Sequence, residues 1–96
     1  MRTAIVFGLL VAATPALGAY FDGNALNELC RSDRQKALFY VMGATDQMPG
    51  LCAPPNTQYE QAMDVVCNYL QFHPEQRQSV AGELARKAIS EAWACS

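Results

Sequence analysis

The chain contains four cysteines that could support three kinds of chemistry: Cys30, Cys52, Cys67 and Cys95. Cysteines can bind zinc, exchange electrons through a C-x-x-C motif, or form structural disulfides. No two of these four are closer than fifteen positions, and the only histidine is His73, so neither the spacing of a zinc site nor a C-x-x-C pair is present. An even number of widely spaced cysteines in a short exported chain predicts two disulfides.

Residues that could form a catalytic site are few. His73, Ser79 and Asp64 can be combined into a triad on paper, but no motif surrounds them. His73 precedes a proline, which is typical of a turn or helix-cap residue, while Asp64 and Glu60 are one helical turn apart, as on a solvated face. The sequence also has no phosphate-binding loop and no metal motif. We therefore predict no catalytic residue, no metal, no cofactor and no enzyme activity.

The first nineteen residues predict export. A positive start at Arg2 is followed by a short apolar run at residues 4–13, then Pro15 and small residues near Gly18 and Ala19. This order is that of a cleavable signal peptide, and a run of about ten residues is too short to span a bilayer, which needs roughly twenty. We expect cleavage after Gly18 or Ala19 and an oxidising, periplasmic location for residues 20–96.

The remaining chain, about 77 residues, is predicted to be one domain, too small for a hydrophobic core alone to give more than marginal stability. It carries six Lys or Arg residues against nine Asp or Glu residues. The basic residues do not cluster along the sequence, which argues against nucleic-acid binding. It contains no second apolar segment long enough for stable membrane insertion.

Hydrophobic periodicity and capping signals predict an all-α fold, a compact bundle of four helices. The first helix is expected at residues 24–31 and the second up to residue 45, with Ser32 and Gln35 as its capping box. Residues 46–56 contain three prolines and form the one sizeable loop. The third helix should run to residue 72 after a capping box of Thr57 and Glu60, and the fourth from Pro74 to residue 93.

The third helix carries two apolar stripes. The first belongs to the core and consists of Tyr59, Ala62, Met63, Val66 and Leu70. The second (Val65, Tyr69 and Phe72) exceeds what one side of a small core requires, so we expect a homodimer; the alternative is that the helix is central to the fold and buries both stripes. The fourth helix should bury an alanine-rich face that begins at Val80. Gly43 in the second helix is expected either to permit close packing or to mark a fraying end.

Helix geometry favours one of the three disulfide pairings. A tight turn makes the third and fourth helices antiparallel, so Cys95 returns to the beginning of the third helix, beside Cys52. Cys67 lies more than about 10 Å further along that helix, which is too far for a bridge to Cys95. The expected pairs are Cys52–Cys95 and Cys30–Cys67.

The mature chain resembles the Rap/Tai family of periplasmic immunity proteins along its whole length. The similar segments are Gly23-Asn24-Ala25-Leu26-x-x-Leu29-Cys30, Tyr40-Val41-Met42-Gly43-Ala44-x-Asp46, Cys52-Ala53-Pro54, Gln61-x-x-Asp64-Val65-Val66-x-x-Tyr69-Leu70, His73-Pro74-Glu75 and Ala88-Ile89-x-Glu91-Ala92-x-x-Cys95. The chain departs from the family pattern at Ala37, where a cysteine is usual, and at Trp93-Ala94, which replaces an aromatic–Pro pair. Cys67 would then replace the lost partner of Cys30.

The resemblance implies a protein that binds and inhibits a toxin of the type VI secretion system, commonly a peptidoglycan amidase. Such an inhibitor needs a rigid scaffold with an element that fills the enzyme's cleft. The candidate partner-binding residues are Asp46, Gln47, Met48 and Leu51, in the loop with limited freedom. The alternative for Met48 and Leu51 is that both side chains pack under the bundle.

Two other functions stay open on the sequence alone. A periplasmic acid-stress chaperone of the HdeA type is also small, exported, helical and disulfide-linked, and protonation of the nine carboxylates would make this chain net positive. A member of the immunity family that has kept no toxin partner is the other alternative.

Overall fold

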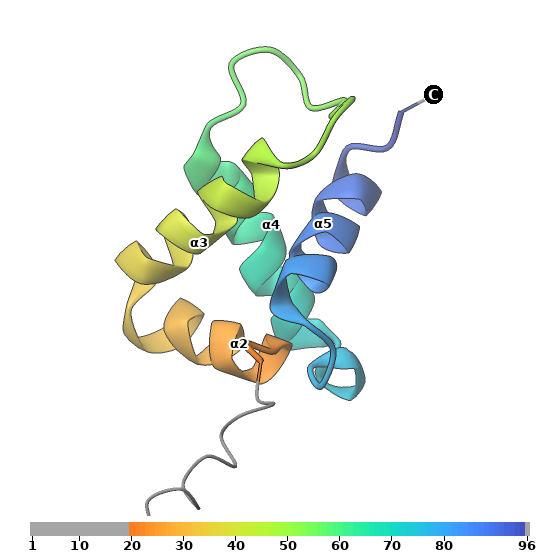
Figure 1. The fold of residues 1–96 in the computed structure, drawn as a ribbon. Coiled ribbons are helices and arrows are strands. Elements are labelled where there is room, and N and C mark those ends of the chain that lie inside the picture. The colour runs from red at the N-terminus through yellow and green to blue at the C-terminus, as the bar shows by residue number, and fades with distance from the viewer. Residues whose placement is uncertain (1–19, 96) are drawn as a thin grey trace, which may run out of the picture.

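The computed structural model describes residues 20–95 as four α-helices and one short 3-10 helix (Figure 1). The helices are α2 (Gly23–Ser32), α3 (Arg34–Asp46), α4 (Tyr59–Phe72) and α5 (Ala81–Ala92), with the 3-10 turn η2 (Pro74–Gln76) between the last two. No strand pairs with another in this part of the chain beyond one isolated bridge, Asp22–Val80. The all-α prediction is confirmed; the expected signal peptide, residues 1–19, lies outside the described residues.

The helices α3 and α4 begin close to the predicted positions, and the N-cap of each lies one residue after the expected one. The N-cap of α3 is Asp33, whose carboxylate accepts from the backbone N–H of Lys36 at 3.2 Å, while Ser32 still belongs to α2. The N-cap of α4 is Gln58, whose backbone N–H donates to Gln61 Oε1 at 2.8 Å. Neighbouring polar residues compete for the same capping role, and only the path of the incoming chain decides between them.

The prediction for the last helix was wrong at its beginning. α5 begins at Ala81, and residues 74–80 form η2 and a turn. Three long-range backbone hydrogen bonds explain the difference: Gly23 N–H donates to Ser79 O at 3.0 Å, Asn24 N–H to Arg77 O at 3.0 Å, and Ala81 N–H to Phe21 O at 2.9 Å. In a continuous helix the Ala81 N–H would donate to Arg77 O, four residues earlier, but it donates to Phe21 O instead, and Arg77 O accepts from Asn24. Val80, expected on a buried face, is 37% exposed as a result.

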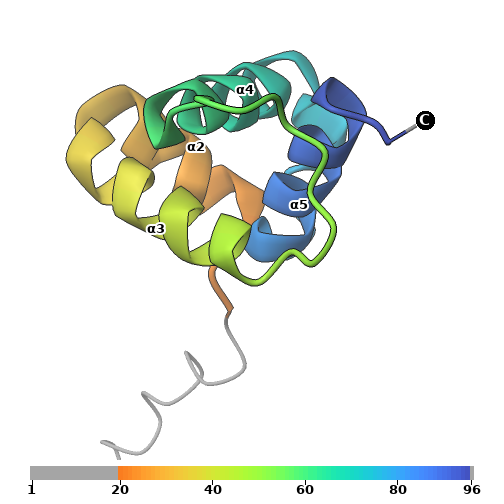
Figure 2. The ribbon, with the colours of Figure 1, turned by 90° about the horizontal axis from the view of Figure 1, so that it is seen from above.

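The core lies where all four helices meet, and its largest fully buried side chains are Leu26, Leu70, Ile89, Val41 and Val66. Seen from above in Figure 2, α3, α4 and α5 surround the core, and α2 lies beneath them. Most of the core face expected for α5 is buried, and its small residues allow the helices to approach closely.

Two glycines make close contacts, and Gly43 is not one of them. A Cβ on Gly23 would lie 2.5 Å from Leu84 Cδ1 and 2.9 Å from Arg77 Cα. The beginning of α2 therefore packs closely against α5 and the α4–α5 turn. A Cβ on Gly82 would be 3.4 Å from the Tyr40 hydroxyl. Gly43 is exposed inside α3 with nothing within 4 Å, so neither role expected for it is present.

Tyr40 connects three elements at the side of the bundle. Its ring lies 4.8 Å from that of Phe21, measured between centroids, and its hydroxyl is beside the Gly82 backbone. Burial raises the pKa of this hydroxyl, against the lowering effects of the nearby Arg86 and of Gly82. The tyrosine of the Tyr40–Asp46 segment thus has a structural place between α3, α5 and the chain before α2.

Both disulfides have the predicted partners. Cys30 and Cys67 join α2 to α4 with a Cα–Cα distance of 5.8 Å, and Cys52 and Cys95 join the long loop to the segment after α5 with a distance of 5.3 Å. The antiparallel course of α4 and α5 in Figure 1 brings these last two together. The pairing deduced from helix geometry is confirmed.

Candidate functional site

The loop between α3 and α4 is the longest irregular segment of the described chain, and it lies at one end of the bundle (Figure 1). We call the loop end the set of elements that meet there: the last turn of α3, residues 47–58, the first turn of α4 and residues 93–95. The opposite end contains α2 and the α4–α5 turn.

Three interactions restrain the loop. The Tyr59 hydroxyl donates to Asp46 Oδ1 at 2.7 Å, which ties the first residue of α4 to the last residue of α3. Cys52, in the middle of the loop, is bonded to Cys95. The Thr57 hydroxyl donates to Pro54 O at 2.7 Å and so closes the turn before α4. A loop held at its base, its middle and its end loses little conformational entropy when it binds a partner.

Two residues give the loop its bends. Gly50 has φ +71° and Asn56 has φ 72°, values in the left-handed region that glycine and asparagine adopt most easily. Gly50 follows Pro49 and precedes the half-buried Leu51, so the bend turns the chain back toward the bundle. The exposed tip therefore consists of Gln47, Pro49 and Gly50.

The four predicted partner-binding residues lie together on the loop but differ in exposure. Asp46 is exposed and accepts the hydrogen bond from Tyr59, and Gln47 is exposed while its backbone N–H caps α3. Met48 and Leu51 are half-buried and pack against the core. This is the arrangement that the sequence left as an alternative for both side chains; the part of either in partner binding stays a prediction.

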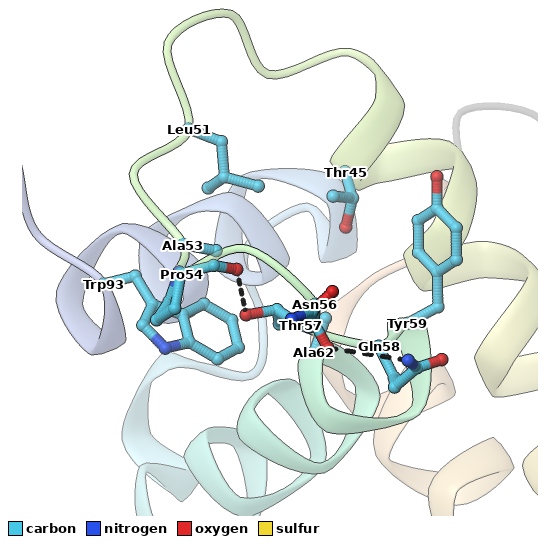
Figure 3. Close-up of a pocket in the computed structure, with 10 residues that line it drawn as sticks. All are labelled: Thr45, Leu51, Ala53, Pro54, Asn56, Thr57, Gln58, Tyr59, Ala62 and Trp93. Carbon is cyan, nitrogen blue, oxygen red and sulfur yellow. Dashed lines mark hydrogen bonds between the residues drawn. The ribbon is translucent and has the colours of Figure 1, made fainter.

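A pocket of about 220 Å³ lies under the loop, as Figure 3 shows. Its lining comes from α3, the loop, α4 and the segment after α5: Thr45, Leu51, Ala53, Pro54, Asn56, Thr57, Gln58, Tyr59, Ala62 and Trp93. Leu51, Pro54, Ala62 and Trp93 give it apolar walls, and Thr45, Gln58 and Tyr59 supply polar atoms. Sequence reasoning missed this pocket, although the single tryptophan, two positions before the last cysteine, pointed to this end of the molecule.

The electrostatics of the loop end are those of a hydroxyl beside a carboxylate. The hydrogen bond to Asp46, together with the negative charge of that carboxylate, raises the pKa of Tyr59 above its usual value of 10.0. The ionised phenol would lose the bond and face a like charge. Tyr59 therefore stays a neutral donor at physiological pH and fixes the position of Asp46.

Two members of the triad considered in the sequence, His73 and Asp64, have other partners. His73 Nδ1 lies 2.9 Å from Tyr69 O and its ring stacks on that of Tyr69, with centroids 4.0 Å apart. Asp64 forms an ion pair with Arg34 at 2.7 Å. Within residues 20–95, no group of three or more His, Cys, Asp or Glu side chains is placed to hold a metal ion. In the same range, no helix has both the length and the apolar character needed to cross a bilayer.

These features define a class: a small, doubly crosslinked helical scaffold that presents one restrained loop with a pocket beneath it. Residues 22–95 match the family model of the Rap1a immunity proteins, so the chain belongs to that family. No curated protein and no solved structure matches it. Membership of an immunity family implies that the protein binds and neutralises a toxin, which agrees with the resemblance found in the sequence.

Proposed function

We propose that this protein is a periplasmic immunity protein that binds and blocks a peptidoglycan amidase delivered by a type VI secretion system. The observation that carries the proposal is the family match over residues 22–95. On this proposal, the protein acts by occupying its partner and catalyses no reaction itself, with a cleaved signal peptide at residues 1–19 ahead of a binding domain at residues 20–96.

The two disulfides support a location outside the cytoplasm. Disulfides form and persist in oxidising compartments such as the bacterial periplasm, where peptidoglycan amidases act. An inhibitor that meets its target there must withstand the same environment as the toxin. A covalently crosslinked scaffold of this size meets that requirement.

We propose the loop end as the contact surface. The restraints on the loop keep its exposed residues Asp46, Gln47, Pro49 and Gly50 in one arrangement before binding. Met48 and Leu51 support that arrangement from beneath and expose only part of their side chains. In this proposal the rigid tip enters or covers the cleft of the amidase.

The decisive experiment is co-purification with an amidase encoded beside this gene, followed by a cell-wall hydrolysis assay with and without the protein. We expect a stable complex and loss of hydrolysis. Truncation of Met48 or Leu51 to alanine should weaken binding by about 2 kcal/mol or more if either is an anchor. Because both side chains touch the core, thermal unfolding of each variant must accompany the binding measurement.

A matched pair separates the two ends of the molecule. Gln47→Arg changes the exposed tip of the loop, and Gln78→Arg makes the same change at an exposed position in the α4–α5 turn. Only the first should weaken inhibition. Asp46→Lys should mainly slow association, as expected for a charge at the rim of an interface. Equal effects of the two glutamine changes would argue against the loop end as the contact surface.

We also propose that the protein forms a homodimer through the second stripe of α4. Phe72 is 71% exposed, and with Val65 and Tyr69 it borders a shallow groove of about 320 Å³ against α5. Light scattering should give twice the mass of a chain of about 77 residues at micromolar concentration, and Phe72→Glu should return it to a monomer. A monomer at high concentration would contradict this proposal.

The chaperone alternative makes a different prediction. Such a protein would protect unrelated proteins from aggregation after acidification and would leave the neighbouring amidase fully active. This result would replace the immunity proposal.

A further inference from the structure

The basic residues of the described chain all lie away from the loop end. Residues 37–76 contain no Lys or Arg, and neither do residues 88–95. All six basic residues of the described chain lie in residues 31–36 and 77–87, which belong to the end of α2, the beginning of α3, the α4–α5 turn and the first seven residues of α5. The loop end, at the top of Figure 1, contains no Lys or Arg and has two acidic residues, Asp46 and Glu60.

A net charge of −2 does not by itself require the basic residues to be absent from one end of the molecule. The two ion pairs seen in residues 20–95, Arg34–Asp64 and Lys36–Asp33, both involve α3 residues from its first turn. Asp46 is bound only by the neutral Tyr59, so its negative charge is not compensated within the described chain. A surface with acidic groups alone attracts positively charged partners and repels negative ones.

The pocket under the loop lies within this acidic end. Its volume of about 220 Å³ is below the range of roughly 300–1,000 Å³ that small-molecule sites occupy, and it suits a single side chain. The apolar walls of Leu51, Pro54 and Trp93 favour an aliphatic or aromatic occupant. Asp46 is exposed and bonded to the Tyr59 hydroxyl of the pocket wall, and the exposed Glu60 follows Tyr59 in the first turn of α4.

We infer that the pocket receives an apolar side chain of the partner protein, presented between basic residues that face Asp46 and Glu60. This inference deepens the proposed function, on which it rests for the existence of a partner. On this inference each protein inserts an element into the other: the loop tip contacts the partner's cleft, and the partner inserts a side chain into the pocket behind the tip. Burial of the inserted side chain supplies affinity, while the acidic rim selects partners with complementary charge.

Two matched peptides test the inference without any toxin. Acetyl-Lys-Phe-Lys-amide and acetyl-Glu-Phe-Glu-amide carry the same apolar centre with opposite charges. In ¹⁵N–¹H spectra of the protein, the Lys peptide should shift the Trp93 indole N–H and the backbone N–H groups of Ala53 and Thr57 in a saturable manner. The Glu peptide should bind at least about five-fold more weakly, because its charges face like charges.

Two matched pairs of variants locate the site. Ala53→Leu places a larger side chain on the pocket wall, and Ala94→Leu makes the same change at an exposed position that does not line the pocket. The first should weaken the Lys peptide at least about ten-fold, and the second should not. Glu60→Lys should reduce the preference for the Lys peptide, whereas Glu28→Lys on α2 should leave it unchanged.

Equal affinity for the two peptides would overturn the inference, as would unchanged binding by Ala53→Leu. If Ala53→Leu disturbs the loop, seen as shifts throughout residues 47–58 without peptide, the Glu60→Lys and Glu28→Lys pair decides the result. Failure here is distinguishable from failure of the proposed function. If the protein binds neither peptide but still neutralises the amidase, only the inference about the pocket is contradicted. If it binds the Lys peptide and leaves the amidase active, only the proposed immunity role is contradicted.

Discussion

The two ends of this molecule are held together by different means. At the end with α2, hydrogen bonds between segments distant in sequence join residues 21–24 to residues 77–81, and the Cys30–Cys67 bridge is buried, at 7% and 8% exposure. At the loop end, the backbone hydrogen bonds of residues 47–58 are local, and both Cys52 and Cys95 are exposed. One end is stabilised by packing, a buried bridge and backbone pairing, while the other depends on an exposed crosslink and two hydrogen bonds from side-chain hydroxyls.

This difference shows how a small domain can carry a shaped binding element. Residues that must meet a partner cannot also be buried in the core, so their arrangement has to come from restraints at the surface. The loop end has such restraints in the Cys52–Cys95 bridge and the Tyr59–Asp46 hydrogen bond. The opposite end can then hold most of the stability of the domain.

The largest test of this comparison is to remove each disulfide separately. Each bridge closes a loop of about forty residues, which is worth roughly 4 kcal/mol in the chain-entropy model. We expect Cys30→Ala with Cys67→Ala to lower the free energy of unfolding by about 4 kcal/mol or more, because it also leaves buried space. Urea unfolding followed by circular dichroism measures the loss.

Cys52→Ala with Cys95→Ala should cost less, about 2 kcal/mol, although its covalent loop is of similar length. Without the bridge, the exposed loop and the segment after α5 gain freedom in the folded state too, which offsets part of the loss. The helical signal should stay unchanged before unfolding. If the two double variants lose the same unfolding free energy, the two bridges stabilise the fold equally, which contradicts the difference between the ends.

A second test concerns the contact between α2 and the α4–α5 turn. Gly23→Ala should lower the free energy of unfolding by about 1–3 kcal/mol, because the new Cβ would overlap Leu84 and the Arg77 backbone. Thermal or urea unfolding measures it. A neutral result would mean that this end is less tightly packed than the distances indicate.

Gly43→Ala is the matched change at an open position, and its effect should have the opposite sign. Nothing lies within 4 Å of the added methyl group, and alanine is favoured over glycine inside a helix by about 1 kcal/mol. We expect a rise in the unfolding free energy of up to that amount. If inhibition of the amidase falls while stability rises, the bare surface of α3 at Gly43 also contacts the partner.

The smallest expected effect is on the pH dependence of the loop end. Asp46 raises the pKa of Tyr59, so this contact stabilises the fold below about pH 10.0 and is lost as the pH rises through the higher folded value. Ultraviolet absorbance should show a tyrosine that titrates above the normal range, and Asp46→Asn should bring it back toward that range. An unchanged titration in Asp46→Asn would remove this restraint from the description of the loop.

The sequence predicted most of the fold because its strongest signals are local. Apolar periodicity placed α2, α3 and α4 within one or two residues, and the antiparallel return of the last helix was sufficient to pair the cysteines. The predicted beginning of α5 was wrong because carbonyls of the α4–α5 turn accept hydrogen bonds from Gly23 and Asn24, more than fifty residues away. Periodicity carries no information about such a contact.

The candidate site was less predictable for the same reason. Proline content identified the loop, but the half-burial of Met48 and Leu51 depends on where the loop meets α5. Tyr59 occupied a core stripe in the sequence pattern and is 40% exposed in the structure, where it donates to Asp46. The pocket exists only because Trp93 returns beside residues 51–54, which the order of residues along the chain does not reveal.

The two disulfides also have a topological consequence. The covalent loops they close, residues 30–67 and 52–95, overlap without either containing the other. A protease that cuts once at any bond between residues 30 and 95 therefore releases no fragment, since at least one bridge spans every such bond. A cut in the exposed stretch at residues 54–56 is spanned by both bridges. Such a nicked protein would keep its full mass on a non-reducing gel and separate into two pieces only after reduction.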